Sequence, residues 1–153
     1  MIKAEDLRIG DIVKVSETGC MIPKGDVCKV VAIDSEKSFE EMNLKGCATL
    51  KELVVNHCSI SCGVWCKYIA PIPLTREILT LNGWNLAKRH IDEDNFEWHD
   101  YYHEDNCINI QYYPKYDSFS AFYDEDSELC EIKYVHELQH ILWALGKDAN
   151  LKI

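Results

Sequence analysis

The sequence predicts an α+β fold in two parts, a small β-barrel over residues 1–70 and a helix, three-stranded antiparallel meander, helix unit over residues 71–153. Three observations support this. The first part holds several short strand-like runs with glycines at the turns. Pro71 and Pro73 cannot continue a sheet ladder, so they mark a boundary. The second part places aromatic-rich strands between two segments with helical periodicity.

Strands are expected in the first part at residues 7–15, 28–33, 48–55 and 63–70, where apolar runs follow turn residues. The segment 34–46 is polar and fits either a helical turn or the tip of a long hairpin. The run Arg8-Ile-Gly-Asp-Ile-Val resembles the first strand of Src-homology-3-like barrels. This resemblance implies a barrel of that kind for residues 1–70.

The second part is expected to begin with a helix over residues 76–82. Thr75 is a suitable N-cap, Glu77 favours the first turn, and Gly83 favours the end of the helix. Three strands should follow, because aromatic and β-branched residues cluster between acidic or proline-containing turns. They are expected at residues 96–103, 107–114 and 117–124.

The last predicted helix covers residues 132–145 and carries one apolar stripe. The stripe consists of Val135, Leu138, Ile141, Leu142 and Leu145. Because this stripe must face the core, His136 and His140 on roughly the opposite side are expected to face solvent or a separate partner surface.

The same helix contains His-Glu-Leu-Gln-His, the HExxH motif of zinc proteases. Two histidines one helical turn apart can supply two zinc ligands, and Glu137 would be the general base. Only thirteen residues follow His140, so a third ligand would come from upstream, where His90, His99 and His103 are the candidates.

Two features favour a structural helix over a metal site. The longer motif HExxHxxGxxH requires glycine and histidine at positions where this chain has Trp143 and Gly146. The predicted outward orientation of the histidines also separates them from the core. We therefore expect no bound cofactor, and we keep a zinc-dependent hydrolase as the alternative.

Composition restricts the function further. The formal net charge is -10, and no basic run is longer than Lys88-Arg89, which argues against direct nucleic-acid binding. No stretch has the length of a transmembrane helix, and the first residues lack the apolar core of a signal peptide. We expect a cytoplasmic protein without membrane contact, whose eight cysteines are reduced.

The cysteine-rich segment 57–66, HCSISCGVWC, is the other place where a metal could be considered. Structural zinc sites usually pair their cysteines as CxxC across a tight turn. Here Cys58, Cys62 and Cys66 are separated by three residues each. On a strand this spacing places them on one face, so we expect small apolar packing residues.

A protein partner could be contacted in two ways. Aromatic residues of the predicted meander could form a contact surface, although rings at alternate positions of a sheet are usually core. They are Trp98, Tyr101, Tyr102, Tyr112 and Tyr113. Alternatively, an acidic cluster at Asp124, Glu125 and Asp126 could face a basic partner, and the protein would then be an acidic inhibitor of a host defence or nucleic-acid-binding protein.

Three segments carry a wider resemblance. They are Leu7-Arg-Ile-Gly-Asp-Ile-Val, Pro71-Ile-Pro-Leu-Thr with Gly83-Trp84, and Ile132-Lys-Tyr-Val-His-Glu-Leu-Gln. Together they resemble a family of small proteins encoded by gut bacteria and their phages, for which no activity is established. The resemblance implies a cytoplasmic accessory protein, often from a mobile element. That family more often has YVHxLQN in the last helix, so Glu137 and His140 look like local variants of a structural helix.

The sequence therefore favours a non-enzymatic accessory protein that binds a protein partner.

Overall fold

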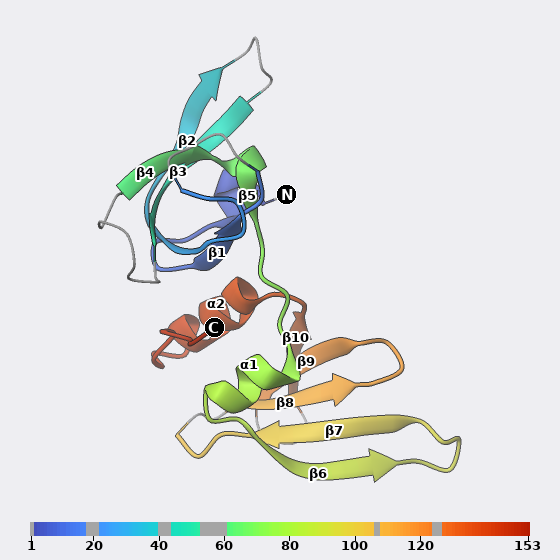
Figure 1. Ribbon diagram of the computed structural model, residues 1–153. Coiled ribbons are helices and arrows are strands. Elements are labelled where there is room, and N and C mark those ends of the chain that lie inside the picture. Colours follow the sequence, from blue (N-terminus) through green and yellow to red (C-terminus); the bar gives the residue numbers. More distant parts are fainter. Residues whose placement is uncertain (1, 18–21, 40–43, 53–60, 106–107, 124–126) are drawn as a thin grey trace. The chain divides into compact units, whose positions relative to one another are not determined.

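The computed structural model describes residues 2–17, 22–39, 44–52, 61–105, 108–123 and 127–153. The chain forms two compact units, Met1–Ile72 and Pro73–Ile153 (Figure 1). The sequence predicts the boundary between residues 70 and 71, beside the same pair of prolines. Neither described helix is long and apolar enough to cross a membrane.

The first unit contains one antiparallel sheet with the strand order β4-β3-β2-β1-β5. Its strands are β1 (Ile12–Val15), β2 (Val27–Phe39), β3 (Leu44–Glu52), β4 (Ser61–Trp65) and β5 (Ile69–Ala70), with short 3-10 turns η1 (Ala4–Asp6) and η3 (Cys66–Tyr68). Strands β2 and β3 form a long hairpin in which Phe39 pairs with Leu44. Of the two arrangements that the sequence allows for segment 34–46, the described residues therefore adopt the hairpin.

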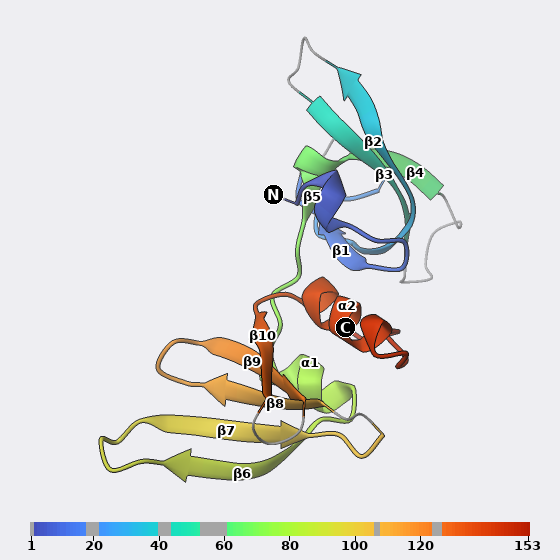
Figure 2. The ribbon, with the colours of Figure 1, turned by 180° about the vertical axis from the view of Figure 1, so that it is seen from behind.

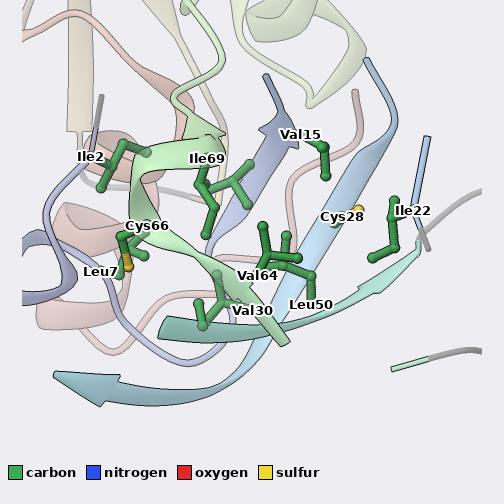
Figure 3. Close-up of a cluster of buried hydrophobic side chains, with 12 residues drawn as sticks. Ile2, Leu7, Val15, Ile22, Cys28, Val30, Leu50, Val64, Cys66 and Ile69 are labelled. Atoms are coloured by element: carbon green, nitrogen blue, oxygen red, sulfur yellow. The ribbon is translucent and has the colours of Figure 1, made fainter. Parts of the chain in front are cut away.

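The core of the first unit is a cluster of aliphatic side chains and thiols contributed by every strand of its sheet (Figure 3). Alternate residues point inward, as shown by Val13 and Val15 of β1 and by Cys28 and Val30 of β2, which are all fully buried. Each buried valine, leucine or isoleucine stabilises the fold by about 1.5–3 kcal/mol relative to exposure. Burial of these side chains therefore stabilises the sheet.

The second unit contains a five-stranded antiparallel meander with the order β10-β9-β8-β7-β6. Its elements are α1 (Arg76–Leu81), β6 (Asn85–Ile91), β7 (Glu97–Tyr102), β8 (Ile108–Tyr113), β9 (Ser118–Tyr123), β10 (Ser127–Ile132) and α2 (Val135–Ala144). Both helices lie on the same side of this sheet (Figures 1 and 2). We call the other side of the sheet the open face.

Strand β8 shows how the two faces differ. Ile108, Ile110 and Tyr112 are buried, whereas the alternating residues Asn109 and Gln111 are only partly buried. Because directly paired residues of neighbouring strands point to the same face, the pairing register determines what else the open face carries. It aligns Lys88 of β6, Asp100 of β7, Gln111 of β8 and Ser120 of β9 in one row across the open face.

Local capping defines the ends of α1. The side chain of Thr75 accepts a hydrogen bond from the backbone N–H of Ile78, as expected for an N-cap. At the other end, Asn82 donates from its side chain to the carbonyl of Lys152 and accepts from the backbone N–H of the same residue. The C-terminal segment is therefore fastened to the end of α1.

The predicted fold class is wrong. The chain is mostly β, with two antiparallel five-stranded sheets and two short α-helices. Among the described residues, the edge strands β4 and β5 of the first sheet do not pair with each other, so this sheet is open and does not form a Src-homology-3-like barrel. The meander of the second unit has five strands instead of three.

The two strands missing from the prediction are β6 and β10, which lie at the edges of the second sheet. Nearly all residues of these strands are exposed, so their sequences need no alternation of apolar and polar side chains. The prediction depends on clusters of aromatic and β-branched residues, which the three inner strands contain and the two edge strands lack.

Candidate functional site

The HExxH motif lies in α2, where Glu137 has a structural role. Its Oε2 accepts hydrogen bonds from the backbone N–H groups of Lys133 (2.7 Å) and Tyr134 (3.1 Å). These groups lie at the start of the helix, where backbone donors have no partner within the helix itself. Glu137 therefore completes the N-terminus of α2.

The two histidines of the motif differ in exposure, since His136 is buried and His140 is half-buried. His136 is buried, with 5% of its surface exposed, and its ring stacks on Tyr134 at 5.8 Å and meets His140 edge-on at 5.7 Å. Of the two expected environments, exposure to solvent is therefore wrong for His136. Gln139 is also buried and donates to the carbonyl of Ala149, whereas Leu145 of the predicted stripe is 38% exposed, so the buried side of α2 differs from that stripe.

The upstream histidines have other partners. A hydrogen bond of 2.6 Å joins His90 to Asp100, and another of 2.6 Å joins the buried His99 to Glu97. The ring of His103 lies 4.8 Å from the ring of Trp84, and its Nδ1 accepts from the backbone N–H of Asp105. Within the described part of the chain, no group of three or more His, Cys, Asp or Glu side chains is arranged to hold a metal ion.

The capping role of Glu137 leads to a test. Glu137→Ala is expected to lower the free energy of unfolding by about 1 kcal/mol, because two backbone donors lose their acceptor. Glu137→Gln should cost less, since an amide oxygen can still accept. Urea unfolding followed by circular dichroism measures both, with the exposed Glu104→Ala as the control. Equal stabilities of Glu137→Ala and the control would refute the capping role.

The thiols of the first unit are placed for packing. Burial raises the pKa of Cys66 to about 11, and burial also raises the pKa of Cys47. Both remain protonated near neutral pH, whereas a nucleophile or metal ligand would be a thiolate. Cys62 lies in β4 and Cys66 begins the turn η3, while His57 and Cys58 fall outside the described residues.

The open face of the second unit carries a cluster of aromatic rings. The ring of Phe96 lies 6.2 Å from Trp98, 5.9 Å from Tyr113 and 6.1 Å from Tyr116. Tyr116 is 62% exposed, so the cluster is accessible from solvent. Large aromatic side chains in such positions are common at protein interfaces.

Next to this cluster the open face is hollowed. The hollow has a volume of about 620 Å³, within the range of small-molecule binding sites. We call it the Asp100 hollow. Its lining includes Lys88, His90, Trp98, Asp100, Gln111 and Phe122.

Asp100 is the most unusual group in this hollow. One carboxylate oxygen, Oδ2, is hydrogen-bonded to His90, whose ring is stacked on Trp98 at 4.7 Å with an interplanar angle of 1°. The other oxygen, Oδ1, is buried and has no hydrogen-bond donor among the described residues. Buried acceptors are nearly always satisfied, so Oδ1 requires an explanation.

The residues proposed from the sequence as partner contacts do not share one surface. Trp98 lies on the open face, whereas Tyr101 and Tyr112 are buried on the face that the helices cover. Tyr112 donates to Asp117 and lies under the guanidinium of Arg76 at 5.2 Å. The acidic residues Asp124, Glu125 and Asp126 lie outside the described residues.

Sequence reasoning missed Asp100, His90 and Gln111 as a group. The only local signal was a charged residue between aromatic residues, in the run Trp98-His-Asp-Tyr-Tyr. The grouping itself arises from the register between three strands. This register cannot be read from one strand alone.

The fold and the site thus define a mostly β chain of two open antiparallel sheets, one of which has an aromatic face with a polar hollow. Comparison of the chain with models of protein families, with curated proteins and with solved structures finds no match.

Proposed function

We propose that this protein is a non-enzymatic binding protein and that its open face contacts a protein partner with a basic surface. The observation that carries the proposal is the combination of an exposed aromatic cluster with a polar hollow on a sheet face that neither helix covers. Aromatic residues in such positions supply much of the energy of protein association.

The charge of the chain supports a basic partner. A formal net charge of -10 attracts cationic surfaces and accelerates their encounter. The resemblance to small proteins of gut bacteria and phages would make this an accessory protein of a mobile element acting in the cytoplasm. The alternative role as an acidic inhibitor would depend on Asp124, Glu125 and Asp126.

The zinc-hydrolase alternative receives less support from the geometry. Glu137 would have to leave two backbone donors to serve as a general base, and the three upstream histidines are each engaged elsewhere. We therefore do not adopt it.

The proposal is tested by substituting the open face. Trp98→Ser and Phe122→Ser should weaken binding of a co-purifying partner by about tenfold or more, because interface aromatic residues dominate binding energy. The control is Leu81→Ser in α1, which removes a side chain that is 52% exposed on the helix side of the sheet. Calorimetric titration measures the affinity after thermal unfolding has shown that each variant folds.

The expected pattern is retention of the partner by the wild type and Leu81→Ser, with loss in both open-face variants. Equal affinity in all four proteins would contradict the proposal, as would a wild-type protein that retains no partner.

A further inference from the structure

We infer that the Asp100 hollow binds an arginine side chain of the partner, with the guanidinium group donating to the carboxylate of Asp100. This inference rests on the proposed function and assigns the chemistry of its central contact.

The first argument is the unsatisfied acceptor. Oδ1 of Asp100 is buried without a donor, while Oδ2 is occupied by His90. An unpaired buried acceptor destabilises the folded protein, and more so when it is charged. Oδ1 itself is enclosed, but 29% of the Asp100 side chain is exposed, so a cation in the hollow stabilises the negative charge of the carboxylate from its exposed side. A guanidinium provides several N–H groups in a planar fork, so it can reach this carboxylate and a neighbouring oxygen together.

The second argument is the chemistry of the walls. Trp98 and Phe122 present aromatic rings to the hollow, and Asn109 and Gln111 present amide groups. A guanidinium is flat and weakly hydrated, so it stacks on aromatic rings in a way that an ammonium group does not. The side-chain oxygen of Gln111 already accepts from the hydroxyl of Tyr113 at 2.7 Å, which holds this wall in place.

The third argument is the sign of the local charge. Burial raises the pKa of Tyr113, and the negative charges of Glu128 and Asp100 raise it further. Glu128 pairs with Phe122 in the sheet register, so its carboxylate belongs to the same face. Around the hollow these acidic groups are opposed by Lys88 and, when protonated, by His90.

Lys88 does not neutralise Asp100 in the structure. The two residues are directly paired across β6 and β7, but no ion pair joins them in the described part of the chain, and Lys88 is exposed. A phosphate group would require several cationic side chains converging on one point, and here the only lysine or arginine in the lining stands opposite a carboxylate. The hollow therefore suits a cation better than an anion.

The test uses two blocked peptides of the form Gly-X-Gly, in which X is arginine or its neutral isostere citrulline. Each is titrated into the full-length, ¹⁵N-labelled protein and followed by NMR. The arginine peptide should shift the amide signals of residues 98–102 and 109–111, with a dissociation constant on the order of 1 mM. The citrulline peptide should bind about tenfold more weakly, because it lacks the charge.

Three variants test whether binding of the arginine peptide depends on the charge of Asp100. Asp100→Asn should weaken binding of the arginine peptide by about tenfold, whereas Glu104→Gln, which removes the same charge from an exposed loop position, should leave it unchanged. Lys88→Gln should strengthen binding about twofold to threefold, since it removes a repelling charge. The NMR spectra of the free variants show whether the sheet is intact.

Several outcomes would overturn the inference. They are equal binding of the arginine and citrulline peptides, no effect of Asp100→Asn, or absence of binding up to about ten times the expected dissociation constant. The proposed function is judged separately. If Trp98→Ser and Phe122→Ser release the partner while Asp100→Asn retains it, the inference fails and the proposed function stands.

Discussion

Replacing Trp84 by alanine is expected to lower the free energy of unfolding of the second unit by about 3–5 kcal/mol, because a large core side chain leaves a cavity. Trp84 follows α1, is 1% exposed, and meets the ring of His103 edge-on at 4.8 Å. Its backbone N–H bonds to the carbonyl of Leu79, so the ring position is tied to the end of the helix.

The measurement is urea unfolding followed by circular dichroism. Trp143→Ala is the matched control, since Trp143 is 64% exposed, and we expect a change of about 0.5 kcal/mol or less. Trp84→Phe should cost less than Trp84→Ala, because phenylalanine keeps most of the volume and removes an indole N–H that has no acceptor among the described residues. A cost for Trp84→Ala no larger than that of the control would show that the ring is not part of the core.

Gly46→Ala is expected to destabilise the first unit by about 2–4 kcal/mol, combining backbone strain with overpacking. Gly46 lies in β3 with φ +67, a conformation that favours glycine, and a Cβ atom there would lie 2.6 Å from the Cβ of Ala4 and 3.4 Å from the thiol of Cys66. The turn η1 can approach β3 this closely only because position 46 has no side chain.

The substitution Gly25→Ala separates the cost of backbone strain from the cost of overpacking. Gly25 also has a positive φ, +94, but a Cβ atom there would meet no atom within 4 Å. Gly25→Ala should therefore cost only the strain, about 1 kcal/mol. Urea unfolding followed by circular dichroism measures both variants. If Gly46→Ala and Gly25→Ala lower the free energy of unfolding equally, η1 moves away from β3 without destabilising the first unit.

The elements predictable from sequence are those determined by neighbouring residues. Helix α1 begins after Thr75 because that side chain caps it, and this signal lies within four residues. The inner strand β8 alternates between buried and partly buried residues, and its sequence shows this alternation. Local chemistry was sufficient in both cases.

The remainder depends on segments far apart in the chain. Whether β4 and β5 pair decides between a barrel and an open sheet, and no single strand contains that information. The burial of α2 has a similar origin: Gln139 is covered because residues beyond the helix return to it and present the carbonyl of Ala149. A helical wheel of α2 alone does not contain this contact.

The candidate site was predictable only in part. Trp98 is a candidate contact residue from the sequence alone because of its size. Asp100 becomes a candidate only because His90 lies on one neighbouring strand and Gln111 on the other. A carboxylate at that position could equally have been an ordinary solvated residue. Its lack of a donor on Oδ1 is visible only once all three strands are aligned.

The hydrogen bonds between Lys152 and Asn82 affect the order in which the second unit folds. Every strand of the second sheet pairs with the strand next to it in sequence, so the sheet can grow by adding successive hairpins with little entropy lost in closing loops. The bond between Asn82 and Lys152 spans 70 residues and can form only after the whole meander has been synthesised. We therefore expect the strands to assemble early and the carboxyl terminus to dock last.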